Sequence, residues 1–248
     1  MKVVRTIADL DAGTGIVGLV PTMGALHAGH EALIAAARAE CDTVVVSLFV
    51  NAAQFNEDAD LVAYPRDEAR DAAIAEEAGA DVLFAPAADE MYPPGFQTWV
   101  DVDELSRGLE GAHRPGHFRA VATVCLKLFN IVRPRFAYFG QKDAQQVAVV
   151  RRLVRDLNLD LTVRSIPTVR DADGLALSSR NARLSAEERA LALSLPRALA
   201  TRDPDAARAM LDGLDVDYVE VADFDPPVLA AAVRVGSTRL IDNVILDG

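Results

Sequence analysis

Short apolar runs alternate with helical patterns over the first two thirds of the chain, and this alternation restricts the possible folds most strongly. Strand-like runs lie at 15–20, 43–50, 81–86, 135–140 and 159–169, and helical patterns lie at 30–40, 66–79, 117–132 and 143–157. The run TVVVSLFV at 43–50 is apolar and largely β-branched, which is typical of a strand covered on both faces. The sequence therefore predicts a Rossmann-like, doubly wound α/β fold, with a parallel sheet between two layers of helices.

The pattern changes near residue 170. Two helical stretches follow at 186–200 and 204–213, and strand-like runs follow at 217–224 and 230–246. This order predicts a second, smaller α+β domain at the C-terminus. We place the domain boundary so that the larger domain covers residues 1–168 and the smaller domain covers residues 169–248.

Composition narrows the class of protein. The chain has 248 residues, of which 51% are hydrophobic, so we expect a packed globular core. Its net charge of -12 argues against a nucleic-acid partner. No run of 18 apolar residues and no apolar leader is present, so we expect a cytoplasmic protein with no membrane partner. Cys41 and Cys125 lie far apart in apolar runs and are interpreted as buried thiols.

A glycine pattern at 13–18, GTGIVG, matches the dinucleotide-binding consensus in spacing only. Its glycines precede and enter a predicted strand, and no helix follows them directly. A nicotinamide or flavin site needs a helix N-terminus at that place to receive the pyrophosphate. We therefore do not interpret this segment as a cofactor site.

The segment PTMGALHAGH at 21–30 has the context that GTGIVG lacks, because a strand ends there and a helix begins. A helix N-terminus at the carboxyl end of a parallel strand attracts anions. Gly24 and Gly29 allow a close approach of the backbone, and His27 and His30 can donate ring N–H groups to phosphate oxygens. A zinc site would need a third ligand at metal-binding spacing, and none is present nearby. Two purely structural histidines remain the alternative.

The H-x-G-H pattern resembles the nucleotide-binding signature of class I aminoacyl-tRNA synthetases and nucleotidylyltransferases. A wider set of motifs resembles the pantothenate synthetase (pantoate–β-alanine ligase) family. These motifs occur from near the start of the chain to near its end: VPTMGALHAGH, SLFVNAAQF, YPRD, HRPGHF, FGQKDAQQ, PTVRDADGLALSSRN and GSTRLIDN.

The resemblance implies a two-step reaction. ATP activates the carboxylate of pantoate as an acyl adenylate and releases pyrophosphate, and the amine of β-alanine then displaces AMP. The first step joins two anionic groups, so catalysis should rest on positioning and charge neutralisation. The family also implies a magnesium ion with ATP and a homodimer.

The resemblance also assigns residues to roles. It gives catalytic roles to His27, His30, Lys142 and Arg180. It places these residues around ATP: Met23, Gly24, His27, Gly29, His30, Gly140, Lys142, Asp143, Val169, Leu177, Ser178, Ser179 and Arg180. Gln54 and Gln146 match the ligands of pantoate, Gln54 also borders the β-alanine site, and Asp71 is the candidate magnesium ligand. Arg114 and His117 are expected to shape the wall of the site.

Three departures from the family pattern are visible: an alanine at 52 or 53 where proline is usual, Gln141 where glutamate is common, and Ala120 where glycine is usual. The chain is also short for the family. A nucleotidylyltransferase that only transfers AMP is the main alternative function. A module that binds ATP without turnover and a class I synthetase are the others, although a synthetase would need a longer chain and a basic surface.

Overall fold

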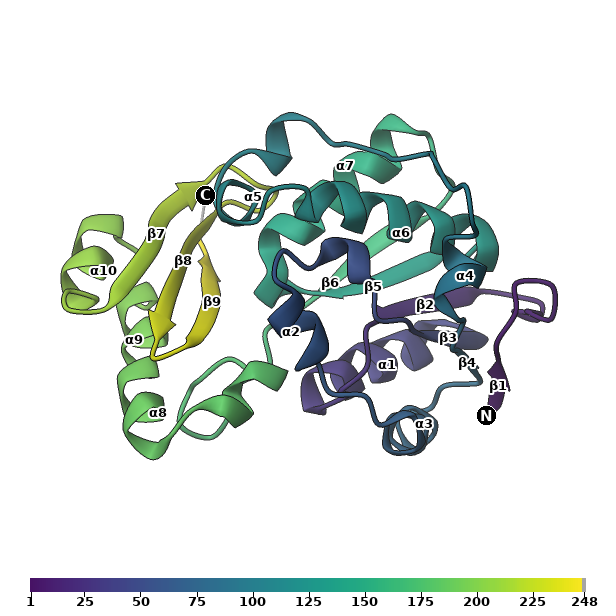
Figure 1. Ribbon diagram of the computed structural model, residues 1–248, viewed down its shortest axis with the longest axis horizontal. Helices are drawn as coiled ribbons and strands as arrows, with labels where there is room; N and C mark the ends of the chain where they lie inside the picture. The colour runs from purple at the N-terminus through teal and green to yellow at the C-terminus, as the bar shows by residue number, and fades with distance from the viewer. Residues whose placement is uncertain (247–248) are drawn as a thin grey trace.

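A six-stranded parallel sheet forms the larger part of the computed structural model, which describes residues 1–246. Its strands lie in the order β1-β4-β3-β2-β5-β6 (Figure 1). They are β1 (Lys2–Val4), β2 (Val17–Thr22), β3 (Thr43–Leu48), β4 (Val82–Phe84), β5 (Phe136–Gly140) and β6 (Thr162–Ile166). The doubly wound α/β fold predicted from the alternation is thereby confirmed.

Helices cover both faces of this sheet. The long ones are α1 (Ala28–Glu40), α3 (Glu68–Glu77), α6 (His117–Val132) and α7 (Ala144–Asp156). Neighbouring residues of β3 face opposite sides, as strand geometry requires. Val45 packs in the core under α6 and α7, whereas Val44 and Val46 pack in the core under α1 and α3. Burial on both sides explains why the 43–50 run is almost continuously apolar.

Strand β1 was not predicted from the sequence. It has only three residues, two of them exposed, and it pairs in parallel with β4 at the edge of the sheet.

The GTGIVG segment lies as expected, because Gly13 and Gly15 are in the loop before β2 and Gly18 is inside β2. Short elements fill the connections: α2 (Asp58–Val62), α4 (Ala88–Met91), α5 (Glu110–His113), and the 3-10 turns η1 (Ala52–Gln54), η2 (Glu104–Ser106) and η3 (Gln141–Asp143).

The C-terminal part, residues 169–246, contains a three-stranded antiparallel sheet in the order β7-β8-β9. Its elements are η4 (Ser179–Arg183), α8 (Ala186–Ala192), α9 (Ser194–Leu199), α10 (Pro204–Met210), β7 (Asp215–Ala222), β8 (Val228–Val235) and β9 (Thr238–Ile245). The apolar run 230–246 falls on two strands of a hairpin that turns at Gly236–Ser237, and the predicted helix 186–200 divides into two.

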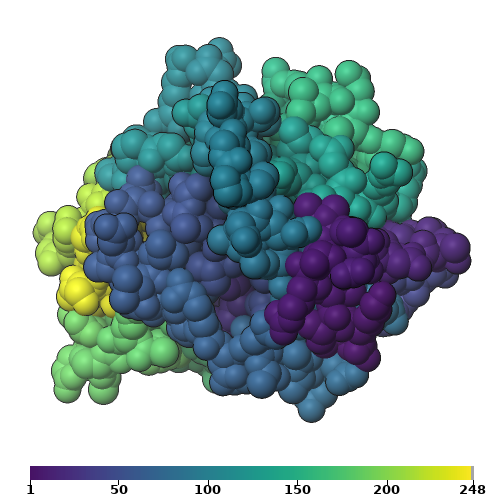
Figure 2. Space-filling model, turned by 45° about the vertical axis from the view of Figure 1, so that its right-hand side comes forward, coloured from purple at the N-terminus to yellow at the C-terminus, as the bar shows by residue number. Residues whose placement is uncertain are grey.

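Buried charges connect the C-terminal part to the larger part. Arg239 of β9 donates to both carboxylate oxygens of Glu110 in α5 at 2.6 and 2.7 Å, and to Asp217 of β7 at 2.5 Å. The hydroxyl of Tyr218 donates to the same Glu110 at 2.9 Å. On the outside, Arg183 pairs with Asp60 of α2 at 3.0 Å, and Figure 2 shows the blue segment around α2 beside the green and yellow C-terminal part.

Within residues 1–246, no helix combines the length and the apolar character needed to cross a membrane.

Candidate active site

A cavity of about 260 Å³ opens at the carboxyl ends of β2 and β5, where the C-terminal part meets the sheet. Nearly all of the residues predicted to bind ATP or pantoate line this cavity. They are Met23, His27, Gly29, His30, Gln54, Gly140, Lys142, Asp143, Gln146, Val169, Leu177, Ser178, Ser179 and Arg180. The structure does not place Gly24 and Asp71 in the lining of this cavity.

The two histidines of the H-x-G-H segment form the N-terminal cap of α1. His27 is the N-cap, and its Nδ1 accepts a hydrogen bond from the backbone N–H of Gly29 at 3.1 Å. His30 returns the bond, because its Nδ1 accepts from the backbone N–H of His27 at 3.3 Å. A Cβ on Gly29 would lie 2.8 Å from the His27 ring, so glycine is needed there for space. The capping box places both rings over the helix N-terminus.

This cap fixes the tautomer of each ring. A neutral imidazole that accepts at Nδ1 carries its proton on Nε2, so both rings can donate from Nε2. Burial, together with the adjacent His27 ring, lowers the pKa of His30 to about 3. Burial and the nearby Lys142 also lower the pKa of His27. Both rings are therefore neutral hydrogen-bond donors at pH 7, which suits phosphate oxygens at a helix N-terminus.

Gly24 and Asp71 have structural roles that the sequence did not reveal. Asp71 has only 1% of its surface exposed, and its carboxylate accepts from the backbone N–H groups of Ala25 and Leu26 at 2.9 and 2.8 Å. Gly24 has a positive φ of 90°, and a Cβ there would meet Asp71 at 2.9 Å. Asp71 thus fixes the loop that leads to His27, and its geometry favours this role over magnesium binding.

We expect Asp71→Asn to destabilise the protein while leaving its requirement for magnesium unchanged. The amide would set an N–H group against one of the two backbone N–H groups, at a cost of ~1–3 kcal/mol in the free energy of unfolding. Urea unfolding measures the loss, and a magnesium titration of activity checks the second expectation. A large rise in the magnesium concentration needed for activity, without a loss of stability, would restore Asp71 as a ligand.

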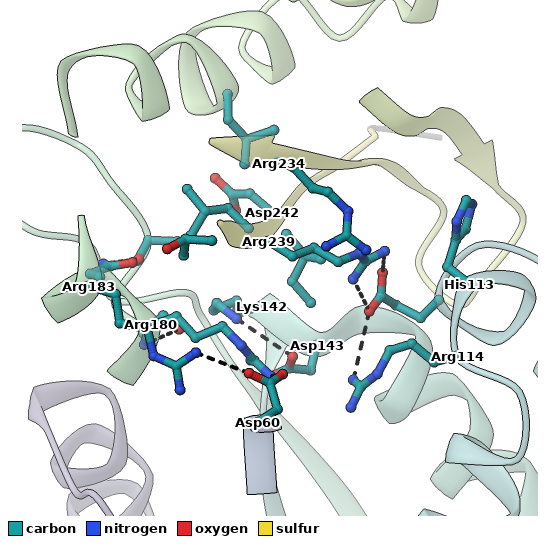
Figure 3. Close-up of a pocket in the computed structure, with 18 of the residues that line it drawn as sticks. Asp60, His113, Arg114, Lys142, Asp143, Arg180, Arg183, Arg234, Arg239 and Asp242 are labelled. Carbon is teal, nitrogen blue, oxygen red and sulfur yellow. Dashed lines mark hydrogen bonds and ion pairs between the residues drawn. The ribbon is translucent and has the colours of Figure 1, made fainter. Parts of the chain in front are cut away.

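Two cationic segments line the same cavity as the histidines. Lys142 lies in the turn η3 between β5 and α7, and its Nζ is 3.7 Å from Asp143 Oδ1. Ser178 caps η4, where its Oγ accepts from the backbone N–H of Arg180, and the hydroxyl proton has no acceptor among residues 1–246. Arg180 reaches Asp60 at 3.7 Å, and Figure 3 shows Lys142 and Arg180 on the same side of Asp60.

A second cavity of about 140 Å³ adjoins the first. Both cavities are lined by Arg114, Lys142, Asp143, Ser178 and Arg180. Figure 3 shows the arginines of this second cavity arranged around Lys142, and several of them are already paired with carboxylates. The side chains predicted to bind phosphate thus lie where the C-terminal part and the sheet meet.

Gln54 is held by three neighbours. Asn51 donates to Gln54 Oε1 at 3.1 Å, which leaves the Nε2 group of Gln54 as the free donor. His117 and Arg114 both contact the backbone carbonyl of Gln54, at 3.0 and 3.3 Å, and Arg114 also reaches His117 Nε2 at 3.2 Å. Burial and Arg114 lower the pKa of His117 to about 4, so the ring is neutral and its Nδ1–H donates to that carbonyl.

Sequence reasoning did not find Asn51 and Tyr64, which also line the cavity. Asn51 is 1% exposed, and its Oδ1 is buried without a partner among the described residues. The position of Asn51 after β3, at the carboxyl end of a parallel strand, was the available signal. Tyr64 donates its hydroxyl to the carbonyl of Gly24 at 3.3 Å and carries no comparable signal.

The neighbouring amides Gln145 and Gln146 differ in role. Gln145 is buried, and its Nε2 donates to the carbonyls of Leu105 and Gly108 at 2.9 and 2.8 Å. Its Oε1 accepts from the backbone N–H of Glu110. Gln146 faces the cavity, and its amide makes no hydrogen bond to the rest of residues 1–246. Only Gln146 is therefore available to a substrate.

Magnesium fits this site as an ion held mainly by a ligand's phosphates. Residues 1–246 contain no cluster of three or more histidine, cysteine, aspartate or glutamate side chains that would hold a metal alone. Asp143 is the carboxylate in the wall of the larger cavity, beside Lys142. One carboxylate together with phosphate oxygens and water is the usual environment of Mg²⁺ at nucleotide sites.

The fold and the site together define an α/β nucleotide-binding enzyme of the H-x-G-H type, in which two side-chain amides line the same cavity as the residues predicted to bind phosphate. The chain belongs to the pantoate-beta-alanine ligase family, whose model matches residues 1–245. The sequence is 52% identical to a pantothenate synthetase of Heliobacterium modesticaldum over 285 aligned positions that cover both chains completely. It is 47% identical to the pantothenate synthetase of Geobacter sulfurreducens, over 99% of each chain.

Solved structures agree with this assignment. Pantothenate synthetase from Thermus thermophilus superposes with a TM-score of 0.93, at 44% identity and over 99% of each chain. The pantoate-beta-alanine ligase of Francisella tularensis, solved as a complex with "Beta-gamma ATP" and β-alanine, gives a TM-score of 0.86 at 34% identity. It covers 99% of this chain and 97% of its own. The family resemblance predicted from the motifs is confirmed.

Proposed function

We propose that this protein is an ATP-dependent ligase that condenses pantoate with β-alanine through a pantoyl-adenylate, and that it releases pyrophosphate and AMP. The observation that carries this proposal is the convergence of two kinds of group on one cavity. His27, His30, Lys142 and Arg180 provide phosphate-binding donors, while Gln54 and Gln146 provide neutral amides beside them. A small hydroxy acid and a nucleotide phosphate can therefore lie side by side.

The first step is the attack of the pantoate carboxylate on the α-phosphorus of ATP. One C(O)O–P bond forms, the bond to the β-phosphate oxygen breaks, and pyrophosphate leaves with the electron pair. The carboxylate is already ionised, so no general base is needed. The neutral Nε2–H donors of His27 and His30 and the ammonium of Lys142 stabilise the negative charge that builds up on the phosphate oxygens.

The second step is attack by the free amine of β-alanine on the acyl carbon. The C–N bond of the amide forms, the bond between the acyl carbon and the phosphate oxygen breaks, AMP leaves with the electron pair, and the amine gives up one proton to solvent. Gln54, which the family resemblance places beside the β-alanine site, lines the cavity next to Arg114 and His117. Magnesium bound to the ATP phosphates, with Asp143 as the protein carboxylate, would neutralise part of the charge in the first step. A homodimer remains a prediction from the family.

An enzyme that stops after adenylyl transfer is the second candidate, because the phosphate donors alone would support it. A coupled assay separates the two. Pyrophosphate and AMP are measured with ATP, magnesium and pantoate, with and without β-alanine. Sustained AMP release that requires both acids supports the ligase. Continuing pyrophosphate release with no response to β-alanine would replace it by an adenylyltransferase, and ATP binding without turnover would leave only a binding module.

We expect Gln146→Ala to weaken the use of pantoate much more than the use of ATP. The substitution removes an amide that faces the cavity and makes no bond within residues 1–246, so the fold should be unaffected. The loss of a hydrogen bond to a bound ligand should raise the KM for pantoate by about 10-fold. Steady-state kinetics with each substrate varied in turn give the two values. Equal losses for pantoate and ATP would mean that Gln146 does not contact pantoate.

A further inference from the structure

The turn that carries Lys142 is fastened by a side chain from the C-terminal sheet. Asn243 of β9 has 5% of its surface exposed, and its Nδ2 donates to the backbone carbonyls of Gln141 and Lys142, both at 2.9 Å. These carbonyls belong to η3, between β5 and α7. Both amide protons of Asn243 are therefore used on this one turn, although Asn243 and Lys142 are 101 residues apart in the sequence.

The same contact continues into the main sheet. The Nε2 group of Gln141 donates to Asn243 Oδ1 at 3.3 Å, and Ser165 of β6 donates to Gln141 Oε1 at 2.7 Å. A chain of hydrogen bonds thus leads from β6 through the turn to β9. Because each amide has both its donor and its acceptor engaged, neither can rotate without losing bonds.

Asn243 is itself held from the other side. Its backbone N–H donates to Asp242 Oδ1 at 2.8 Å, and Asp242 forms two hydrogen bonds with Arg170, at 2.6 and 3.0 Å. Arg170 lies at the start of the C-terminal part, just after Val169 of the cavity wall. The position of β9 against the turn is therefore fixed from two directions.

We propose that Asn243 is a positioning residue for Lys142, through which the C-terminal sheet sets the place of the lysine ammonium in the phosphate pocket. The inference rests on the proposed function, since it takes the phosphates of ATP to be the ligand of Lys142. Without the two Asn243 bonds, the turn loses one donor to the buried carbonyl of Gln141 and one to the part-buried carbonyl of Lys142, and it can shift. Misplacement of a catalytic group by about 1 Å can cost on the order of 100-fold in rate.

The test compares pyrophosphate release by the wild type, Asn243→Ala, Asn243→Asp and the control Val244→Ala. Asn243→Asp keeps the size of the side chain but sets a carboxylate oxygen against carbonyl oxygens, so it tests donation even if Asn243→Ala fails to fold. Val244 is the next residue of β9, points to the opposite side and packs against the core of the C-terminal part. The wild-type rate of pyrophosphate release, measured with pantoate and β-alanine present, tests the proposed function separately.

We expect both Asn243 variants to release pyrophosphate about 10- to 100-fold more slowly, while Val244→Ala lowers only the Tm. In a Lys142→Ala background, measured in single turnover at high enzyme concentration, Asn243→Ala should cause no further loss. A folded Asn243 variant with a wild-type rate would overturn the proposal. Losses that multiply in the double variant, or an equal loss in Val244→Ala, would also overturn it, because they would show a general structural effect.

Discussion

Lys142→Ala should reduce pyrophosphate release from ATP and pantoate by about 100- to 1000-fold, the effect of removing one preorganised donor at a site of developing charge. The Lys142 side chain is 18% exposed, and its Nζ lies 3.7 Å from Asp143. An ion pair at that distance contributes little to stability. The Tm should therefore stay close to the wild-type value while the rate of the first step falls.

The choice of control matters, because the chain carries a net charge of -12 and any lost cation changes the field around the site. Arg155→Ala is a matched control, since Arg155 is an exposed cation in the last turn of α7. Its pyrophosphate release should equal that of the wild type. Near-normal release by Lys142→Ala would remove the lysine from the phosphate site, and a loss shared by both variants would point to bulk charge.

His30→Asn should lower the rate of adenylate formation by about 100-fold and leave α1 intact. An asparagine Oδ1 can take the place of His30 Nδ1 and accept from the backbone N–H of His27, so the cap is kept. The Nε2–H donor that faces the cavity is lost. The measurement is single-turnover pyrophosphate release, with circular dichroism and Tm to follow the helix.

His30→Gln provides the complementary variant, because its longer side chain brings an amide N–H near the position of Nε2. We expect it to recover part of the rate that His30→Asn loses, although the cap is weaker. If His30→Asn kept the wild-type rate, the ring would be only a helix cap, which is the structural alternative that the sequence left open. Equal losses in the two variants would mean that the shape of the ring matters more than the donor.

The sheet and its two helix layers were predictable because each long element carries its own periodic signal. The run at 43–50 is apolar on both faces, and β3 is buried on both faces by α1 and α6. Strand β1 was missed because three residues are too few to show a period, and its stability comes from pairing with β4. The hairpin at Gly236–Ser237 lies within an apolar run whose strands differ little in composition.

The candidate site could be predicted where a sequence motif includes the residue. It was much less predictable where a contact joins residues that are far apart in the sequence. Gln145 and Gln146 are adjacent and identical in type, and only the fold shows that one supports the loop before α5 while the other faces the cavity. Asp71 looks like a metal ligand on a helix, yet two backbone N–H groups that lie 45 and 46 residues away use its carboxylate. Asn243 ends the GSTRLIDN motif, but that motif does not reveal that the partners of Asn243 lie in η3.

The buried Glu110–Arg239–Asp217 group makes the two halves of the molecule mutually dependent. Glu110 belongs to the larger half, and its two oxygens are occupied by Arg239 and Tyr218 from the smaller half. A chain cut near residue 168 would keep every strand of the parallel sheet, but Glu110 would lose Arg239 and Tyr218, would keep only Arg114 at 3.9 Å as a cationic partner, and would be opened to water. The same cut would remove Val169, Leu177 and Arg180 from the cavity wall, so the predicted ATP pocket is complete only when both halves are present.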